Sequence, residues 1–273
     1  MSRLAARFEE LRNEGDGALV AFVVAGHPDV ERSSRILLSI ADAGADVIEL
    51  GIPFSDPLAD GPVIQAASQT ALSKDVTPAQ VLEMAAARRR ARDVPLVIMT
   101  CYNPIVQFGV EQFARDSAAA GVDGVIVTDL PPEEADEWVG VATSHHVDTI
   151  FLLAPTSPPD RVKKIVDLAT GFVYCVSRMG VTGTRAELPA NLNDFVGRVR
   201  AQTQKPVAVG FGVSRPEHVA EVCGLADGAV VGSAVVSLID RELSSAGLTQ
   251  SVAGFVKELK AATKGKRPAP RDA

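Results

Sequence analysis

The sequence has little of what a disulfide-stapled or membrane-spanning protein needs. Its cysteines are Cys101, Cys175 and Cys223, an odd and widely spaced set that makes no disulfide framework and suits a reducing compartment. No apolar run approaches the roughly 20 residues that cross a bilayer. Residues 1–14 mix charged with apolar positions, which indicates an amphipathic helix and not a signal peptide. We therefore expect a soluble, cytoplasmic protein without membrane contact.

Basic residues are also scarce. The 27 Lys and Arg are outnumbered by 34 Asp and Glu, which gives a formal net charge of -7. Nucleic acids and anionic membrane surfaces are bound by basic patches, so neither is an expected partner. A small anionic substrate stays compatible, because one site can be locally positive inside an acidic protein.

Several cofactor motifs are missing from the sequence. It has no HExxH or CxxC spacing, no P-loop lysine motif and no GxGxxG fingerprint. The pair His145-His146 precedes a predicted strand and so faces the rim opposite to a barrel's active site. No lysine directly follows a predicted strand, which argues against a Schiff-base aldolase. We expect neither a metal nor a cofactor in this chain.

What the sequence does have is a regular alternation of apolar runs and helical stretches. Continuous apolar runs are typical of parallel strands buried on both faces. Eight are present: Ala18–Val24, Val47–Leu50, Leu96–Thr100, Gly124–Val127, Thr149–Leu153, Phe172–Val176, Val207–Val209 and Ala229–Val231. Helical patterns between them include Val30–Ala43, Pro78–Arg92, Val110–Ala120 and Pro159–Ala169.

Eight strands alternating with helices predict a single-domain (β/α)8 TIM barrel over residues 1–263, with an N-terminal helix and extra helices. A doubly wound open sheet is the alternative, but it commonly has five or six strands. Acidic residues recur at three helix-to-strand junctions: Asp46, Asp123 and Asp227. Residues 264–273 are basic and contain prolines, and we expect a disordered tail there.

The second predicted strand and the loop after it carry two carboxylates. Glu49 ends an aliphatic run, where desolvation favours its protonated form and would make it a proton donor. A strand-end glutamate in a salt bridge is the other interpretation. The next segment, Ile52–Pro62, is a long, proline-stiffened loop that carries Asp60. Such loops on a barrel's working face bind ligands or close over them, although a simple spacer also fits.

Glycines follow the last two predicted strands. Gly210 and Gly212 come after one, and Gly232 comes before Ser233 after the other. Barrels often bind phosphate at these two loops and at the start of a short extra helix, which we expect over Ser233–Ile239. Tight turns without a ligand are the alternative.

Three further polar positions are candidates for the same face. Gly183 lies in the stretch after Val176 and could lend its N–H group to a phosphate. Tyr174 either offers its hydroxyl to a substrate or belongs to the core, and Asp129 either lines the pocket or anchors a loop. The residues alone thus predict a barrel enzyme that acts on a phosphorylated small molecule by carboxylate acid–base catalysis.

Read together, these segments resemble the alpha-subunit family of tryptophan synthase. The matching segments run in the family order and cover most of the chain: Glu49–Pro62, Tyr102–Pro104, Asp129–Pro131, Gly180–Gly183, Gly210–Gly212 and Gly232-Ser233. The segment Glu49–Pro62 is the most specific of them. His27 departs from the family pattern, which usually has an acidic or amide residue there.

The resemblance implies a carbon–carbon lyase of tryptophan biosynthesis that cleaves indole-3-glycerol phosphate by a retro-aldol reaction. It implies that Glu49 moves protons to indole C3 and from the glycerol hydroxyl, and that Asp60 holds the indole N–H. It assigns phosphate contacts to Gly183, Gly212, Gly232 and Ser233, and a closing-loop contact to Thr182. Pocket positions are assigned to Phe22, Tyr102, Asp129 and Tyr174.

The resemblance also implies a partner, a β subunit that carries pyridoxal phosphate in an α2β2 heterotetramer. Two alternatives remain open from the sequence. One is a stand-alone lyase of the same fold that releases free indole, and the other is a catalytically silent regulatory subunit.

Overall fold

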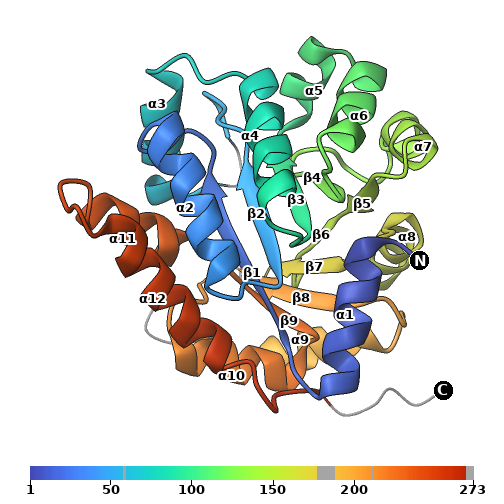
Figure 1. Ribbon diagram of the computed structural model, residues 1–273. Coiled ribbons are helices and arrows are strands. Elements are labelled where there is room, and N and C mark those ends of the chain that lie inside the picture. The colour runs from blue at the N-terminus through green and yellow to red at the C-terminus, as the bar shows by residue number, and fades with distance from the viewer. Residues whose placement is uncertain (58–59, 177–187, 211, 269–273) are drawn as a thin grey trace.

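The computed structural model describes residues 1–57, 60–176, 188–210 and 212–268. Its strands form one parallel sheet with helices on the outside (Figure 1). The strands are β1 (Ala18–Val24), β2 (Val47–Gly51), β3 (Leu96–Thr100), β4 (Gly124–Val127), β5 (Asp148–Ile150), β6 (Leu152–Leu153), β7 (Val173–Val176), β8 (Val207–Gly210) and β9 (Gly228–Val231).

The helices lie between the strands and at both ends of the chain. They are α1 (Arg3–Glu14), α2 (Val30–Asp42), α3 (Pro62–Leu72), α4 (Pro78–Ala91), α5 (Tyr102–Phe108), α6 (Val110–Ala119), α7 (Asp136–Ser144), α8 (Pro159–Leu168), α9 (Leu192–Arg200), α10 (Pro216–Leu225), α11 (Ser233–Arg241) and α12 (Leu248–Ala261). In the described part of the chain, no helix combines the length and the apolar character needed to cross a membrane.

The sheet closes on itself at Phe151. The strand order runs β5-β4-β3-β2-β1-β9-β8-β7-β6, and the two outer members, β5 and β6, are consecutive in the chain. The N–H of Tyr174 in β7 donates to the carbonyl of Phe151 at 3.2 Å, which bridges the interruption. The predicted strand Thr149–Leu153 is therefore present in two pieces, and the predicted barrel is confirmed.

Strand residues alternate between the inside and the outside of the barrel. In β2, Val47 belongs to the interior cluster, whereas Ile48 and Leu50 pack against the surrounding helices. Because both faces are covered, each strand is apolar at nearly every position. Residues two apart along a strand therefore share the interior, and only interior positions in the later part of each strand face the end where the active site of a barrel lies.

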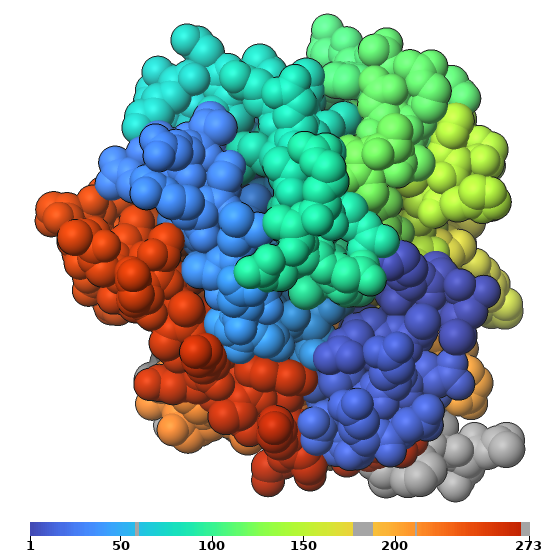
Figure 2. All heavy atoms as spheres, viewed as in Figure 1, coloured from blue at the N-terminus to red at the C-terminus, as the bar shows by residue number. Residues whose placement is uncertain are grey.

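Helix α1 closes the opposite end of the barrel. Its residues Leu4, Phe8 and Leu11 are buried among interior side chains near the starts of the strands, such as Ala18 and Val47. Figure 2 shows α1 in dark blue, seated between the teal residues of α4 and the red C-terminal segment. The end at which the strands begin is thus filled with protein.

The three recurring aspartates attach neighbouring strands at this end. Each carboxylate accepts the backbone N–H at the start of an adjacent strand: Asp46 from Leu19 at 2.7 Å, Asp123 from Leu96 at 2.8 Å and Asp227 from Val207 at 2.9 Å. Each is also approached by an arginine of α1: Arg7 to Asp46 at 2.7 Å, Arg3 to Asp123 at 2.5 Å and Arg12 to Asp227 at 3.9 Å. The junction motif of the sequence is therefore the attachment of the closing helix.

The helix ends follow the expected chemistry. Gly44 and Gly121 adopt φ values of +96° and +75° directly after α2 and α6, a conformation that favours glycine.

The C-terminal segment differs from the expectation, because residues 264–268 lie against the barrel. The N–H of Gly265 donates to Asp16 at 2.8 Å, and Pro268 is buried. Residues 269–273 of the expected tail lie outside the described residues.

We predict that Asp46→Asn lowers the free energy of unfolding by about 3–5 kcal/mol. The Asp46 carboxylate is fully buried and contacts both Arg7 and Lys260, so its neutral replacement removes the counter-charge of Lys260 and leaves Arg7 paired with the exposed Glu10 alone. Urea unfolding followed by circular dichroism measures the loss. Asp42→Asn is the matched control, because Asp42 forms a solvent-exposed pair with Arg92, and its loss should leave the free energy of unfolding nearly unchanged. Equal losses in the two variants would contradict this account of α1.

Candidate active site

Interior positions in the later part of the strands bring the catalytic candidates together. Phe22 in β1 lies in register with Glu49 in β2, and both point into the barrel mouth. Tyr174 occupies the corresponding part of β7. The period-two alternation of the strands thus decides that these side chains share one space.

Glu49 is buried without a counter-charge. The residue is 1% exposed, and its carboxyl oxygen Oε2 has no hydrogen-bond partner among the described residues. Burial, followed by repulsion from Asp60, raises the pKa of Glu49 to about 8. The described part of the chain offers it no salt bridge, so the geometry favours a proton donor over a strand-end ion pair.

Asp60 reaches the same space from the loop that precedes α3. Its backbone carbonyl accepts from the side chain of Gln65 at 2.8 Å, which ties the end of the loop to that helix. Its Oδ1 is buried without a partner in the described residues, and burial raises the pKa of Asp60 to about 6. Asp60 is therefore mostly ionised at neutral pH, whereas Glu49 is mostly protonated.

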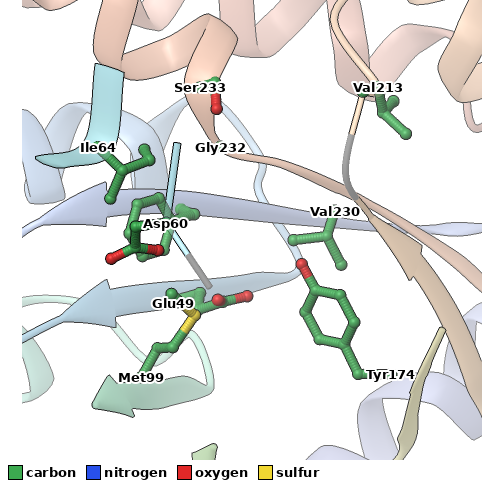
Figure 3. Close-up of a pocket in the computed structure, with 11 residues that line it drawn as sticks. Glu49, Asp60, Ile64, Met99, Tyr174, Val213, Val230, Gly232 and Ser233 are labelled. Carbon is green, nitrogen blue, oxygen red and sulfur yellow. The ribbon is translucent and has the colours of Figure 1, made fainter. Parts of the chain in front are cut away.

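The two carboxyl groups line a pocket of about 440 Å³, which we call the main pocket. Figure 3 shows Glu49 and Asp60 beside Met99 and Ile64, with Tyr174 and Val213 on the other side. The lining residues are Phe22, Glu49, Asp60, Ile64, Met99, Tyr174, Gly212, Val213, Val230, Gly232 and Ser233. Mostly apolar walls with a few convergent polar groups are typical of a small-molecule site.

One end of the main pocket is suited to an anion. Ser233 is the first residue of α11, and Gly232 precedes it as the N-cap. The N–H groups of Val235 and Val236 already donate to the Gly232 carbonyl, so those of Ser233 and Ala234 remain as the orphan donors of the helix start. Gly212 adds a backbone turn with φ of +100° and open space where a side chain would stand. Backbone donors and a helix N-terminus together favour a phosphate.

Gly210 has a different function from the one expected. It does not line the main pocket, and a Cβ at this position would come within 2.9 Å of the Tyr174 ring. The absent side chain therefore makes room for that ring. Burial and the nearby carboxylates Glu49 and Asp60 raise the pKa of Tyr174, which keeps its hydroxyl protonated as a donor.

Besides Gly210, the predicted site residues Tyr102 and Asp129 also lie outside the main pocket. The exposed carboxylate of Asp129 accepts the backbone N–H of Tyr102 at 2.7 Å, at the first turn of α5. Asp129 thus anchors a helix start, which was the second interpretation of its position. Thr182 and Gly183 lie outside the described residues. His27 contacts Asp240 of α11 at 3.0 Å and does not line the pocket.

Four apolar wall residues were missed by the sequence reasoning: Ile64, Met99, Val213 and Val230. Met99 and Val230 carry a recognisable signal, since Met99 lies two residues after the interior residue Val97 and Val230 itself belongs to the interior cluster. Ile64 and Val213 lie beyond strand ends, where no periodicity fixes the direction of a side chain. Within the described ranges, no three His, Cys, Asp or Glu side chains gather as metal ligands would.

Known proteins resemble this chain over nearly its full length. The family model described as "Tryptophan synthase alpha chain" matches residues 8–264. The tryptophan synthase alpha chain of Geobacter sulfurreducens is 47% identical over 262 residues, covering 96% of this chain and 99% of that protein. That of Chloroflexus aggregans is also 47% identical, covering 96% and 98%.

Solved structures give the same result. A structure of Mycobacterium tuberculosis tryptophan synthase has a TM-score of 0.89 and 38% identity, covering 96% of this chain and 98% of that chain. The tryptophan synthase subunit alpha of Legionella pneumophila has a TM-score of 0.90 and 35% identity, with the same coverage. With a full-length sequence match and the same barrel, the chain belongs to the tryptophan synthase alpha chain family.

Proposed function

We propose that the chain is a carbon–carbon lyase that cleaves indole-3-glycerol phosphate to indole and glyceraldehyde 3-phosphate, with Glu49 and Asp60 as its catalytic residues. One observation carries the residue assignment: two carboxyl groups share one apolar pocket, and their environments hold them in opposite protonation states near pH 7. A proton donor and a counter-charge are what this reaction requires.

Glu49 supplies the proton that makes the carbon–carbon bond breakable. Transfer of its proton to indole C3 gives a positively charged indolenine, which accepts the bonding electrons when the bond to the glycerol carbon breaks. The glycerol hydroxyl then loses its proton to the Glu49 carboxylate and becomes the aldehyde. The proton is thus returned, and the indole ring is restored.

Asp60 holds the ring during this step. Its carboxylate accepts the indole N–H and stabilises the positive charge that develops on protonation, where a preformed charge costs no reorganisation. The unpartnered Oδ1 inside the main pocket is suited to this contact. Phe22 supplies an apolar wall, and the protonated Tyr174 hydroxyl offers a donor to the glycerol oxygens.

The phosphate is proposed to bind Gly212, Gly232 and Ser233 at the start of α11. From the resemblance, we also assign Gly183 to the phosphate and Thr182 to a contact with Asp60. We propose that Tyr102 and Asp129 are positioning residues. The hydrogen bond from the Tyr102 backbone N–H to the Asp129 carboxylate fixes the start of α5 to the loop after β4.

We further propose a β-subunit partner that carries pyridoxal phosphate, in an α2β2 assembly located in the cytoplasm. The contact surface assigned to it is the groove beside α3, which is formed by Phe54, Ser55, Asp56, Pro57, Pro62 and Gln65. This groove adjoins the loop that carries Asp60. Light scattering of the mixed subunits tests the stoichiometry.

Glu49→Gln should lower kcat by about 10²–10⁴-fold, because the amide cannot deliver the proton. The same substitution should stabilise the folded chain at alkaline pH. The raised pKa of Glu49 gives stability that is complete below its unfolded value near 4.5 and is lost as pH rises through about 8.

Indole release and thermal midpoints at pH 5 and pH 9 measure the two effects. A shift of one pKa unit corresponds to about 1.4 kcal/mol of free energy. The free energy of unfolding of the variant should therefore exceed that of the wild type by on the order of a few kcal/mol at pH 9 and by little at pH 5. Near-normal turnover in the variant would remove Glu49 from the mechanism.

The pH profile of kcat/KM should be bell-shaped with a maximum near pH 7. Activity requires protonated Glu49 and is lost as pH rises through about 8, and it requires ionised Asp60 and is lost as pH falls through about 6. Initial rates in buffers of constant ionic strength measure the profile, with circular dichroism as the control for folding. A rate that keeps rising above pH 9 would contradict the roles proposed for the two carboxyl groups.

A β subunit should accelerate cleavage by about 5- to 150-fold, the usual range for coupling between two sites. Contact at the exposed Asp56 would position the loop that carries Asp60 and exclude water, as active-site lids do. Steady-state cleavage across a β-subunit titration tests this. Asp56→Ala should lose the acceleration but keep the basal rate, whereas Glu9→Ala, at an exposed site on α1, should lose neither. A high rate that does not respond to the partner would favour a stand-alone lyase. The absence of any cleavage would favour a catalytically silent subunit.

A further inference from the structure

A second, small hollow adjoins the main pocket. Four residues line both spaces: Phe22, Asp60, Ile64 and Met99. The glycine and serine residues of the anion end line only the main pocket. The second hollow therefore begins where Asp60 stands and extends away from the proposed phosphate site.

The remaining walls of the second hollow come from the ends of β1 to β4 and from α3. Val24, Ile52 and Phe54 provide apolar surface, and Ser68, Thr100 and Thr128 add hydroxyl groups. The hydroxyl of Thr100 donates to the Cys101 carbonyl at 3.1 Å, so part of this polar lining is already satisfied. The space suits a small apolar or weakly polar group.

The proposed substrate has a fixed order of groups along this axis. Its phosphate lies at Ser233, its C3 lies at Glu49 and its ring N–H lies at Asp60. The benzo ring is fused to the far side of the ring that carries C3 and the N–H. A substrate held at both ends must therefore direct its benzo edge past Ile64 and Met99, which Figure 3 shows on the Asp60 side of the pocket.

We infer that the second hollow is a specificity subsite that accepts a small substituent, such as a methyl, chloro or hydroxyl group, on the benzo ring of the substrate. This inference rests on the proposed function. Met99 forms the boundary between the two spaces and is only half-buried. Its unbranched, flexible side chain adapts to groups of different shape more readily than a branched residue does.

Ser68 is the residue at which the subsite can be filled without touching the main pocket. It lies on α3, is 4% exposed and lines only the second hollow. Ser68→Met occupies the hollow with a side chain that favours helices, and Ser68→Ala removes the hydroxyl without filling the space. Comparison of the two variants thus distinguishes the effect of filling the hollow from the effect of removing the Ser68 hydroxyl.

The test compares kcat/KM for indole-3-glycerol phosphate and for four analogues, each with one methyl group at a different benzo carbon. The wild-type chain should cleave at least one analogue within about tenfold of the parent substrate. Ser68→Met should lower kcat/KM for that analogue by about tenfold to a hundredfold, the usual effect of one excess methyl group in an apolar pocket. It should change the parent substrate by less than about threefold, and Ser68→Ala should change neither.

Rejection of all four analogues by the wild type would overturn the subsite, and so would equal losses for parent and analogue in Ser68→Met. Thr128→Leu fills the hollow from the opposite wall and replaces Ser68→Met if circular dichroism shows that variant unfolded. Failure of the wild type to cleave the parent substrate would overturn the proposed function itself. Cleavage of the parent without any effect on discrimination would overturn only the subsite.

Discussion

The interior of a closed parallel barrel has to be filled by alternate side chains of its strands, and this constraint organises the rest of the molecule. At the starts of the strands, α1 completes the filling with Leu4, Phe8 and Leu11 and is attached through arginine–aspartate pairs. At the other end, the last interior positions are left uncovered by apolar packing. The pocket lies there because the remainder of the barrel is already packed.

The same packing produces the chemistry of the site. Glu49 occupies an interior position between apolar neighbours, and the desolvation that disfavours its charge keeps it protonated at neutral pH. Asp60 comes from a loop, is less deeply buried, and keeps a lower pKa. Two residues with the same functional group are thus separated into a donor and a counter-charge by where the fold places them. A buried carboxyl group lowers stability at alkaline pH, so the catalytic arrangement opposes the stability of the fold.

Glycine has two distinct uses on the catalytic face. Gly212 adopts a positive φ and leaves open space beside the start of α11, which suits close approach of a phosphate. Gly210, two residues earlier, leaves room for a tyrosine ring instead. One sequence motif therefore leaves open space at one glycine, where we propose that the phosphate binds, and serves internal packing at the other.

The sequence by itself determined the barrel, and it placed two carboxylates and the glycines of the proposed phosphate site at one end of it. Continuous apolar runs require burial on both faces, and residues directly after parallel strands gather at one end, so Glu49, Asp60 and Ser233 were predictable. Only the tertiary structure decided where Asp129 and Ile64 point, what fills the space at Gly210 and where the strand after Asp148 is interrupted. The physical reason is that strand periodicity fixes side-chain direction inside a strand. Beyond the strand end, direction depends on hydrogen bonds and packing with segments distant in the chain.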